Sequence, residues 1–386
     1  MKFKGNIHSK LPNVGMTIFS VMSKLATETG AINLSQGFPD FPISEKLVEL
    51  VSKHMRAERN QYAPMPGVPV LREAIAQKME TLYSISYDPD KEITVTAGAT
   101  QAIFTAISTF INEGDEVVIF EPAYDCYVPA IELHGGKPVY VQMDVSGSGP
   151  LINWDQVQKL VNQRTKMIII NTPHNPSGRV MTAQDLSRLE KLTKDSDIII
   201  LSDEVYEHII FDGSEHQSVA RYPKLAERSI IVDSFGKTYH NTGWKVGYVL
   251  APEELTKEFR KTHQYNVFSV NTPIQYALAD YMQDESLYLG LADFYQEKRD
   301  TFNRMLEGSK FTVEPSAGTY FQLLGYSKIS DEADTEMAIR LTKEIGVASI
   351  PISVFFHEKQ DDKLLRFCFA KENETLERAA EKLLKL

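Results

Sequence analysis

The sequence has few cysteines, few tryptophans and no long apolar run. Cys126 and Cys368 are the 2 cysteines among 386 residues, and both stand between aromatic and aliphatic neighbours, in YDCYVP and LRFCFA. This context favours buried, reduced thiols over a disulfide, as is typical of a cytoplasmic protein. The longest apolar stretches, such as MIII, have the length of a strand, whereas a membrane helix needs about 20 apolar residues. We therefore expect no disulfide, no membrane span and a cytoplasmic location.

The sequence also lacks an excess of positive charge. Lys and Arg total 41 against 52 Asp and Glu, which gives a net charge of −11 with neutral histidines. Nucleic acids and anionic membranes attract basic surfaces, so neither is an expected partner. The opening MKFKGNIHSKLP has charges and a proline where a secretory leader would be apolar. The length suggests two domains, or one large domain with an appendage. A chain of this length folds without a metal, and we predict no metal site.

Seven short runs rich in Val and Ile predict strands that are covered on both faces. These runs are residues 92–98, 116–122, 137–142, 166–173, 197–204, 229–235 and 246–250. Between them, apolar residues at spacings of three and four predict helices over 101–111, 123–134, 153–162 and 182–194. Alternating strands and helices predict an α/β fold with a mostly parallel central sheet.

Beyond residue 252 the pattern changes to long helices with few strands. Helices are predicted over 253–265, 272–282, 287–306, 334–345 and 374–384, and strands over 317–324 and 364–370. Helices segregated from a few strands predict a smaller α+β domain. We expect residues 37–285 to form a large domain and 286–386 the smaller one. Residues 1–36 have little periodicity and are expected to pack as an arm against one of the two.

The segment SIIVDSFGKTYHNTGW contains the strongest candidate for a catalytic residue. Lys237 closely follows a buried strand, so we expect it at the sheet edge where α/β proteins bind ligands. Desolvation lowers the pKa of a lysine, and the neutral amine can then form a Schiff base with a carbonyl. A solvated loop lysine is the alternative. A serine acyl-enzyme S-x-x-K motif is excluded because the segment follows a strand and no KTG partner is present.

Two other strand ends carry polar side chains. Asp203 ends the strand in ILSDEVYEH and needs a cation or donors if it is buried, and Tyr206 follows three residues later. Asn175, in NTPHNPSG, precedes a proline that holds it extended, so its amide can bond a phenolate or a carboxylate. The alternatives are a helix cap for Asp203 and an ordinary turn for the NPSG segment.

Small residues in TVTAGATQAIF and an arginine in LLRFCFAK complete the candidates. Gly98, Ala99 and Thr100 open a predicted helix whose free N–H groups and dipole can bind an anion. The spacing matches neither a Walker A loop nor G-x-G-x-x-G, so a nucleotide is not expected. Arg366 lies within an apolar strand, where its planar fork suits a carboxylate ligand or an internal ion pair.

Together these residues supply an amine, a carboxylate, a phenol, an amide, an anion site and a carboxylate clamp. Pyridoxal 5′-phosphate requires such a set. The chain resembles fold-type I aminotransferases of class I, and most of all the branch of kynurenine/glutamine aminotransferases and bacterial methionine aminotransferases. The resemblance covers nearly the whole chain through the motifs LSQGFPDF, YAPMPGVPVLREAIA, AGATQAI, EPAYDCY, NTPHNPSG, SDEVYEH, SFGKTYHNTGWKVGY and LRFCFAK.

The resemblance implies a role for each residue that would bind the cofactor. Lys237 would form the Schiff base and move the substrate proton, and Asp203 would keep the ring nitrogen charged. Asn175 and Tyr206 would bond the phenolic oxygen, and Tyr124 would stack on the ring. The residues that would bind the phosphate are Gly98, Ala99, Thr100, Ser234 and Lys245, together with Tyr62 from the neighbouring subunit of a homodimer.

The resemblance also implies how the substrate would bind. Arg366, Gly37 and Asn175 would hold its carboxylate, and Phe38 would lie near its side chain. The aromatic residues near the expected site favour bulky uncharged amino acids, such as methionine, aromatic amino acids, histidine, glutamine or kynurenine. The amino group would pass to a 2-oxo acid in a ping-pong reaction. No second basic residue for a distal carboxylate is evident, so aspartate is not an expected donor.

Two other functions are considered. A cysteine-S-conjugate β-lyase would use the same carbanion at the substrate Cα, and the candidate residues do not distinguish it from an aminotransferase. A ligand-binding regulator with an aminotransferase-like body is disfavoured. The 33 residues that precede LSQGFPDF are too few for the DNA-binding domain such a regulator carries.

Overall fold

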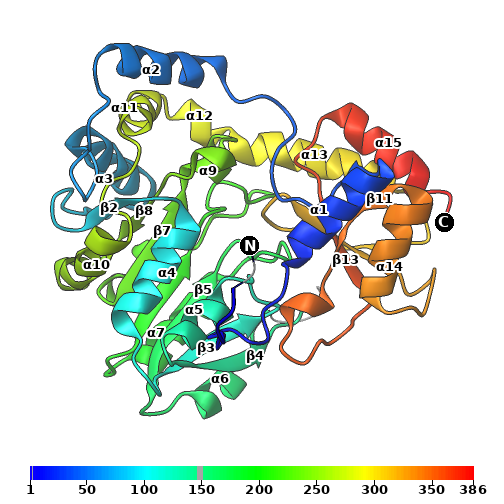
Figure 1. The fold of residues 1–386 in the computed structure, drawn as a ribbon, viewed down its shortest axis with the longest axis horizontal. Coiled ribbons are helices and arrows are strands. Elements are labelled where there is room, and N and C mark those ends of the chain that lie inside the picture. Colours follow the sequence, from blue (N-terminus) through cyan, green and yellow to red (C-terminus); the bar gives the residue numbers. More distant parts are fainter. Residues whose placement is uncertain (2, 146–150) are drawn as a thin grey trace.

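The computed structural model describes residues 1, 3–145 and 151–386, and a seven-stranded sheet lies in its larger part (Figure 1). The strands are β2 (Ile93–Thr96), β3 (Glu116–Glu121), β4 (Lys137–Gln142), β5 (Thr165–Asn171), β6 (Ile199–Asp203), β7 (Ser229–Ser234) and β8 (Gly247–Leu250). Their order is β2-β8-β7-β6-β5-β3-β4. β8 is antiparallel to both its neighbours, and the other adjacent pairs are parallel. The predicted α/β fold with a mostly parallel sheet is confirmed.

Helices cover both faces of this sheet, which explains its apolar strands. In β5, Met167 and Ile169 face one buried cluster while Ile168 and Ile170 face the other, as the two-residue period of a strand requires. The first cluster includes residues of α4 (Ala99–Phe110), α5 (Tyr127–Leu133) and α10 (Glu253–Asn266). The second includes residues of α3 (Pro69–Tyr83), α6 (Trp154–Leu160), α7 (Ala183–Thr193) and α11 (Thr272–Tyr281).

A second, antiparallel sheet lies in the C-terminal part of the chain. Its order is β12-β13-β10-β9. The strands are β9 (Thr312–Val313), β10 (Phe321–Gly325), β12 (Ile350–Pro351) and β13 (Leu364–Cys368). The helices of this part are α12 (Ser286–Leu289), α13 (Leu291–Met305), α14 (Asp334–Arg340), a π-helical turn over Leu341–Ile345 and α15 (Asn373–Leu383). Few strands with segregated helices agree with the predicted α+β character.

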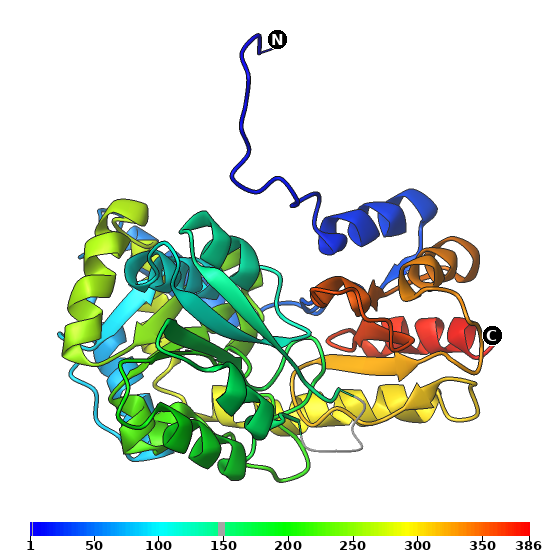
Figure 2. The same cartoon turned by 90° about the horizontal axis from the view of Figure 1, so that it is seen from below.

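The first 36 residues contain a helix that the sequence analysis did not predict. α1 (Ile18–Thr29) begins after Thr17, whose hydroxyl accepts from the Ser20 N–H, and ends at Gly30 in a left-handed conformation. Periodicity did not reveal α1 because its buried residues are Met22 and Ala26. β1 (Ile32–Asn33) pairs with β11 (Val347–Ala348), so this segment lies against the C-terminal part (Figure 1). Residues 3–16 extend away from the body (Figure 2).

Three predicted element boundaries differ from the structure. The helix predicted over 287–306 is interrupted at Gly290, a residue type with low helix propensity. The strand predicted over 317–324 begins only at Phe321, because Thr319 has a φ of 63°. The helix predicted over 123–134 begins only at Tyr127, and the Ala123 N–H before it donates to the Phe355 carbonyl.

Of the remaining helices, α2 (Glu45–Arg56) packs against α11. The others are short, namely α8 (Pro223–Ala226), α9 (Phe235–Thr238), and 3-10 turns over Val219–Arg221, Thr242–Trp244 and Ser353–Phe355. In the part of the chain that the structure describes, no helix combines the length and the apolar character needed to cross a membrane. Cys126 and Cys368 are free, with Cys368 buried and Cys126 half-buried.

Candidate active site

The polar candidates meet because one edge of the large sheet collects the ends of its parallel strands. Asn171, Asp203 and Ser234 are the last residues of β5, β6 and β7. Gly98 stands between β2 and α4 at the same edge. β8 runs antiparallel and begins at this edge, which brings Lys245 to it from the other direction. Ligands of open α/β sheets bind at such an edge.

A cavity at this edge brings ten of the predicted residues together. They are Gly98, Ala99, Thr100, Tyr124, Asn175, Asp203, Tyr206, Ser234, Lys237 and Lys245. Four lining residues were not predicted, namely Ile103, Asn171, Val205 and Thr242. The placement of the ten follows from the strand ends, while their individual roles stay predictions.

The amine of Lys237 is buried and held by two oxygen atoms. Lys237 lies in α9, directly after β7, and its Nζ donates to the Gly37 carbonyl at 3.2 Å and to the Tyr320 hydroxyl at 2.9 Å. Burial lowers the pKa of Lys237 to about 8, with a further lowering from Arg366 and an opposing effect from Asp203. A substantial fraction of this amine is therefore neutral and nucleophilic in mildly alkaline solution.

The carboxyl group of Asp203 is buried at the end of β6, and the chain continues into a turn rather than a helix. Its Oδ2 accepts from the Tyr127 hydroxyl at 2.6 Å, and its Oδ1 accepts from the Val205 N–H at 3.4 Å. Burial raises the pKa of Asp203 to about 6, although these donors and Lys237 oppose the rise. A buried carboxyl with so few donors can accept a cationic ring nitrogen, which supports the ligand interpretation over the helix cap.

The N-terminus of α4 forms a narrow cradle beside a lysine. Gly98, with a φ of 79°, precedes the helix, and a Cβ on it would lie 3.4 Å from Cε of Lys245. A Cβ on Gly247 would lie 3.2 Å from the Ala99 nitrogen. The two glycines thus keep the backbone N–H groups accessible next to an ammonium group. This combination of helix N-terminus and cation fits a phosphate.

The guanidinium of Arg366 is fully buried and bonded to neutral oxygens. Its Nη1 donates to Asn175 Oδ1 at 2.7 Å and its Nη2 to the Ser35 carbonyl at 3.1 Å. The guanidinium carbon lies 3.9 Å from the ring centre of Phe321, and its Nε is buried without a hydrogen-bond partner. None of the ion pairs found among the described residues involves Arg366, so the internal ion pair considered above is not supported. Among the described residues, Arg366 thus has no carboxylate partner at ion-pair distance.

Four predicted residues lie outside the cavity lining, namely Arg366, described above, and Gly37, Phe38 and Tyr62. The Gly37 carbonyl accepts from the Lys237 amine but does not line the cavity. Phe38 is 41% exposed, and its carbonyl accepts from Lys371 Nζ at 2.7 Å in a separate surface hollow. Tyr62 is 80% exposed and packs edge-on against Phe268. Within this one chain, neither Phe38 nor Tyr62 joins the other site residues.

Three residues that contact the predicted ones were missed. Asn171 donates from Nδ2 to the Asp203 carbonyl at 2.9 Å, and its Oδ1 accepts from the Asn175 N–H at 2.8 Å. Its position at a strand end was a usable signal. Tyr127 belongs to the motif EPAYDCY, but nothing local indicates that it reaches Asp203. Tyr320 is 83 residues from Lys237 in sequence, so only the tertiary fold reveals their contact.

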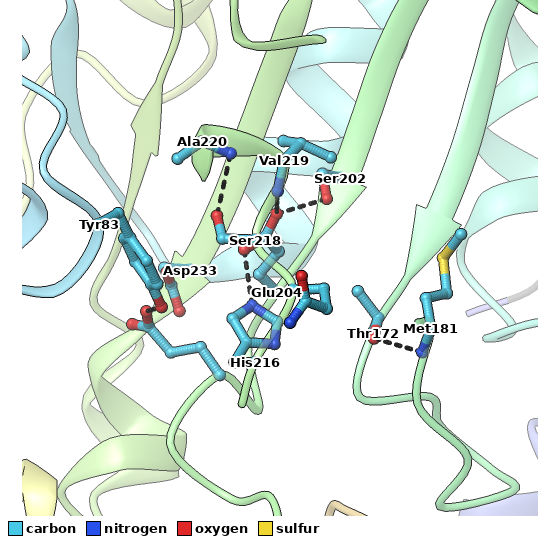
Figure 3. Close-up of polar contacts among 12 residues, drawn as sticks. Tyr83, Thr172, Met181, Ser202, Glu204, His216, Ser218, Val219, Ala220 and Asp233 are labelled. Atoms are coloured by element: carbon cyan, nitrogen blue, oxygen red, sulfur yellow. Dashed lines mark hydrogen bonds and ion pairs between the residues drawn. The ribbon is translucent and has the colours of Figure 1, made fainter. Parts of the chain in front are cut away.

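A buried polar network around Glu204, drawn in Figure 3, supports the turn that carries Tyr206. Beside Asp203, the Glu204 carboxylate accepts from the Ser202 hydroxyl at 2.7 Å and from the Val219 N–H at 3.1 Å, and it pairs with His216 at 2.8 Å. One residue beyond Tyr206, Glu207 pairs with Lys78. The turn is therefore bonded on both sides of Tyr206, which fixes the phenol at the cavity.

Comparison with known proteins identifies the family. The family model described as aminotransferase class I and II matches residues 29–383. The chain is 50% identical to the methionine aminotransferase of Escherichia coli, over 98% of each chain. It is 33% identical to human kynurenine–oxoglutarate transaminase 1, over 94% of each.

Solved structures agree with these matches. The crystal structure of YbdL from Escherichia coli, identified as a methionine aminotransferase, superposes with a TM-score of 0.96 at 49% identity. The superposition covers 99% of this chain and 100% of that one. The predicted fold and transaminase activity are thus confirmed. The chain belongs to the class I and II aminotransferases.

Proposed function

We propose that the cavity holds pyridoxal 5′-phosphate, covalently attached through Lys237, and that the enzyme transfers amino groups from bulky uncharged amino acids to 2-oxo acids. Class I and II aminotransferases use this cofactor. The observation that carries the proposal is the meeting of Lys237, Asp203 and the α4 N-terminus in one cavity. When bound, the cofactor supplies an electron sink for the carbanion at the substrate Cα.

Each group at the cavity supports a defined task. The pKa of Lys237, about 8, leaves a neutral amine to attack the cofactor aldehyde and later to carry the proton of the substrate Cα. Asp203, once ionised, accepts a hydrogen bond from the protonated ring nitrogen and keeps that nitrogen cationic. Lys245 and the N–H groups at Ala99 and Thr100 bind the phosphate. Tyr124 stacks on the ring, while Asn175 and Tyr206 bond the phenolic oxygen.

Arg366 is proposed to bind the α-carboxylate of the substrate. Its guanidinium is already oriented by Asn175 and Ser35, and the unpartnered Nε leaves an unsatisfied buried donor. An unsatisfied buried donor costs about 1–3 kcal/mol, which a carboxylate would relieve. Because the burial of Arg366 excludes competing water, the charged hydrogen bonds to the substrate are strengthened.

The surroundings of Arg366 support an apolar substrate side chain. The rings of Phe19, Phe321 and Phe355 lie 5.2, 3.9 and 6.0 Å from its guanidinium carbon. Among the described residues that line the cavity, the basic ones are Lys237 and Lys245, both assigned to the cofactor. A distal carboxylate, as in aspartate, would find no further cation there. Methionine and aromatic amino acids are accordingly the proposed donors, and the name of the Escherichia coli relative favours methionine.

We also propose a cytoplasmic homodimer in which Tyr62 reaches the phosphate of the partner subunit. Tyr62 and Phe268 form an exposed aromatic pair, with 80% and 49% of their surface accessible. A second copy that covers this pair would bury apolar surface and return the Tyr62 hydroxyl to a polar site. Within each subunit we propose a large domain over 37–285 and a smaller one over 286–386. Residues 1–36 are proposed as an arm that packs on the smaller domain, supported by the pairing of β1 with β11.

The cofactor assignment is tested by absorbance and chemical trapping. The purified protein, supplied with pyridoxal 5′-phosphate, is expected to show a visible band that borohydride abolishes. Peptide mapping should then place the reduced adduct on Lys237. Absence of the band, or an adduct on any other lysine, would contradict the proposal.

The donor preference is tested without choosing an acceptor. The loaded enzyme is mixed with methionine, phenylalanine or aspartate, and the loss of its visible band is followed in a stopped-flow instrument. Methionine and phenylalanine are expected to react faster than aspartate at equal concentration. A faster reaction with aspartate would show that the apolar surroundings of Arg366 do not set specificity.

A further inference from the structure

The amine of Lys237 belongs to a closed triangle of hydrogen bonds. Its Nζ lies 2.9 Å from the Tyr320 hydroxyl and 3.2 Å from the Gly37 carbonyl oxygen. The same hydroxyl donates to the Gly37 oxygen over 2.6 Å. Each of the three polar atoms is therefore bonded to the other two.

The direction of each bond follows from the chemistry of the groups. The Gly37 carbonyl has no proton and must accept from both partners. The single proton of Tyr320 is used on Gly37, so a lone pair of the hydroxyl accepts from Lys237. A neutral amine has two N–H bonds, and each has one of these acceptors. The lone pair of the amine must then point away from Gly37 and Tyr320.

A lone pair that points away from these two acceptors points toward the cavity. Lys237 lines the cavity, whereas the described residues that line it include neither Gly37 nor Tyr320. The two acceptors accordingly do not line the cavity that the amine lines. The lone pair of the amine is directed to the cavity side, where a bound substrate would present its Cα proton.

Tyr320 is held rigidly enough to orient the amine. Its side chain is fully buried, and its ring packs against Tyr206 and Tyr295 with centroids 5.1 and 5.6 Å apart. Its carbonyl accepts from the Phe369 N–H at 3.0 Å. Because packing already fixes this ring, the hydroxyl loses little further freedom when it binds the amine.

The neighbour of Tyr320 contacts the other functional group of the site. Phe321, the first residue of β10, places its ring 3.9 Å from the guanidinium carbon of Arg366. Two consecutive residues thus contact the amine and the guanidinium. The distance between these two contacts is set by the start of β10, which pairs with β13, the strand that carries Arg366.

We propose that Tyr320 is a positioning residue for transamination, which directs the lone pair of the Lys237 amine at the substrate Cα proton. The bound cofactor would supply the sink for the electron pair of the breaking Cα–H bond, and the Lys237 amine would take up that proton and, as an ammonium, release it again to complete the transfer. This inference rests on the proposed function, because it assumes that Lys237 is the proton carrier.

The test compares Tyr320→Phe with Tyr295→Phe as a matched control. Both tyrosines are fully buried and their rings touch, but the Tyr295 hydroxyl bonds to His240 Nδ1 at 2.9 Å and not to Lys237. One measurement uses the apoprotein, in which acetic anhydride labels Lys237 at a series of pH values. Two others use the loaded enzyme, namely kcat and KM for methionine and the kinetic isotope effect with methionine deuterated at Cα.

Tyr320→Phe is expected to change all three measurements. The charged ammonium loses more from a missing acceptor than the neutral amine does, so the pKa of Lys237 should fall by about one unit below its value of about 8. The other groups that act on Lys237, which are Asp203, Arg366, Cys368 and Lys245, are left in place. The kcat should fall about tenfold or more, with KM changed less than about twofold, and the isotope effect should increase because proton transfer becomes slower. Tyr295→Phe should resemble the wild type.

Two outcomes would overturn the inference. One is a Tyr320→Phe enzyme with the wild-type labelling profile, kcat and isotope effect. The other is an equal loss of kcat in both variants, which would reduce Tyr320 to a packing residue. Failure of the proposed function is distinguishable from both outcomes. In that case the wild-type protein itself would give no borohydride-reduced adduct on Lys237.

Discussion

Asp203 makes the stability of the apoprotein depend on pH in a direction opposite to that of most carboxylates. Burial raises its pKa from an ordinary value of 3.8 to about 6. A raised pKa means that the folded state prefers the neutral carboxyl. The stabilising contribution is complete below the unfolded pKa and is lost as pH rises through about 6. A shift of about two units corresponds to about 3 kcal/mol of free energy of unfolding in total.

Asp203→Asn removes this dependence and provides the measurement. The unfolding free energy of the apoprotein is determined by urea denaturation at several pH values and at one protein concentration, for the wild type and the variant. Between pH 5 and pH 7.5 the wild type should lose about 1.4 kcal/mol relative to Asp203→Asn. Hydrogen bonds that the amide cannot make, such as one to Tyr127 or Val205, contribute equally at each pH and cancel in this comparison.

Asp212→Asn serves as the control. Asp212 is paired with Arg299, and hydrogen bonding to that guanidinium lowers its pKa, so its contribution is lost only at pH values below this window. The difference between wild type and this control should therefore stay constant from pH 5 to 7.5. A constant difference for Asp203→Asn as well would refute the assignment of Asp203 as a carboxyl destabilised by burial. Bound cofactor should suppress the wild-type loss, because a cationic ring nitrogen favours the ionised form of Asp203.

Two further predictions concern Tyr127, the hydrogen-bond donor to Asp203, and Arg366, the proposed site for the substrate carboxylate. Tyr127→Phe removes the 2.6 Å donor to Asp203, so the pKa of Asp203 should rise by about one unit and the same urea titration should show its transition at higher pH; an unmoved transition would contradict the role of Tyr127. Arg366→Lys keeps the charge but loses the planar fork that bonds Asn175 and Ser35. Its KM for methionine and for the 2-oxo acid should rise about 30-fold, or about 2 kcal/mol, with a smaller change in kcat, whereas unchanged KM values in steady-state kinetics would exclude it from carboxylate binding.

The sequence determined the sheet and most of the residues at its edge. Runs of Val and Ile indicate strands buried on both faces, and alternation with helices makes these strands parallel. Once the strands are parallel, residues at their ends, such as Asn175, Asp203 and Lys237, must gather at one edge wherever the intervening helices lie. This explains why ten predicted residues line one cavity although they span positions 98 to 245.

The sequence also determined that Arg366 was unusual, but not what it contacts. A guanidinium in an apolar strand requires hydrogen-bond acceptors. From the sequence alone, either a carboxylate of the protein or a carboxylate ligand could provide them. The structure provides the Asn175 amide and the Ser35 carbonyl, which are neutral and leave Nε unpaired. Its availability for a substrate depends on these contacts between distant segments.

Only the tertiary structure decided which groups act on the reactive side chains. Tyr127 reaches Asp203 across 76 residues, and the Tyr320 hydroxyl meets Lys237 across 83 and the Gly37 carbonyl across 283. These contacts depend on how the C-terminal sheet and the segment from α1 to β1 pack against the larger sheet, and no local pattern of residues specifies that packing. Periodicity and strand ends specify a side chain's own surroundings, whereas the orientation of the Lys237 lone pair depends on atoms supplied by other segments of the chain.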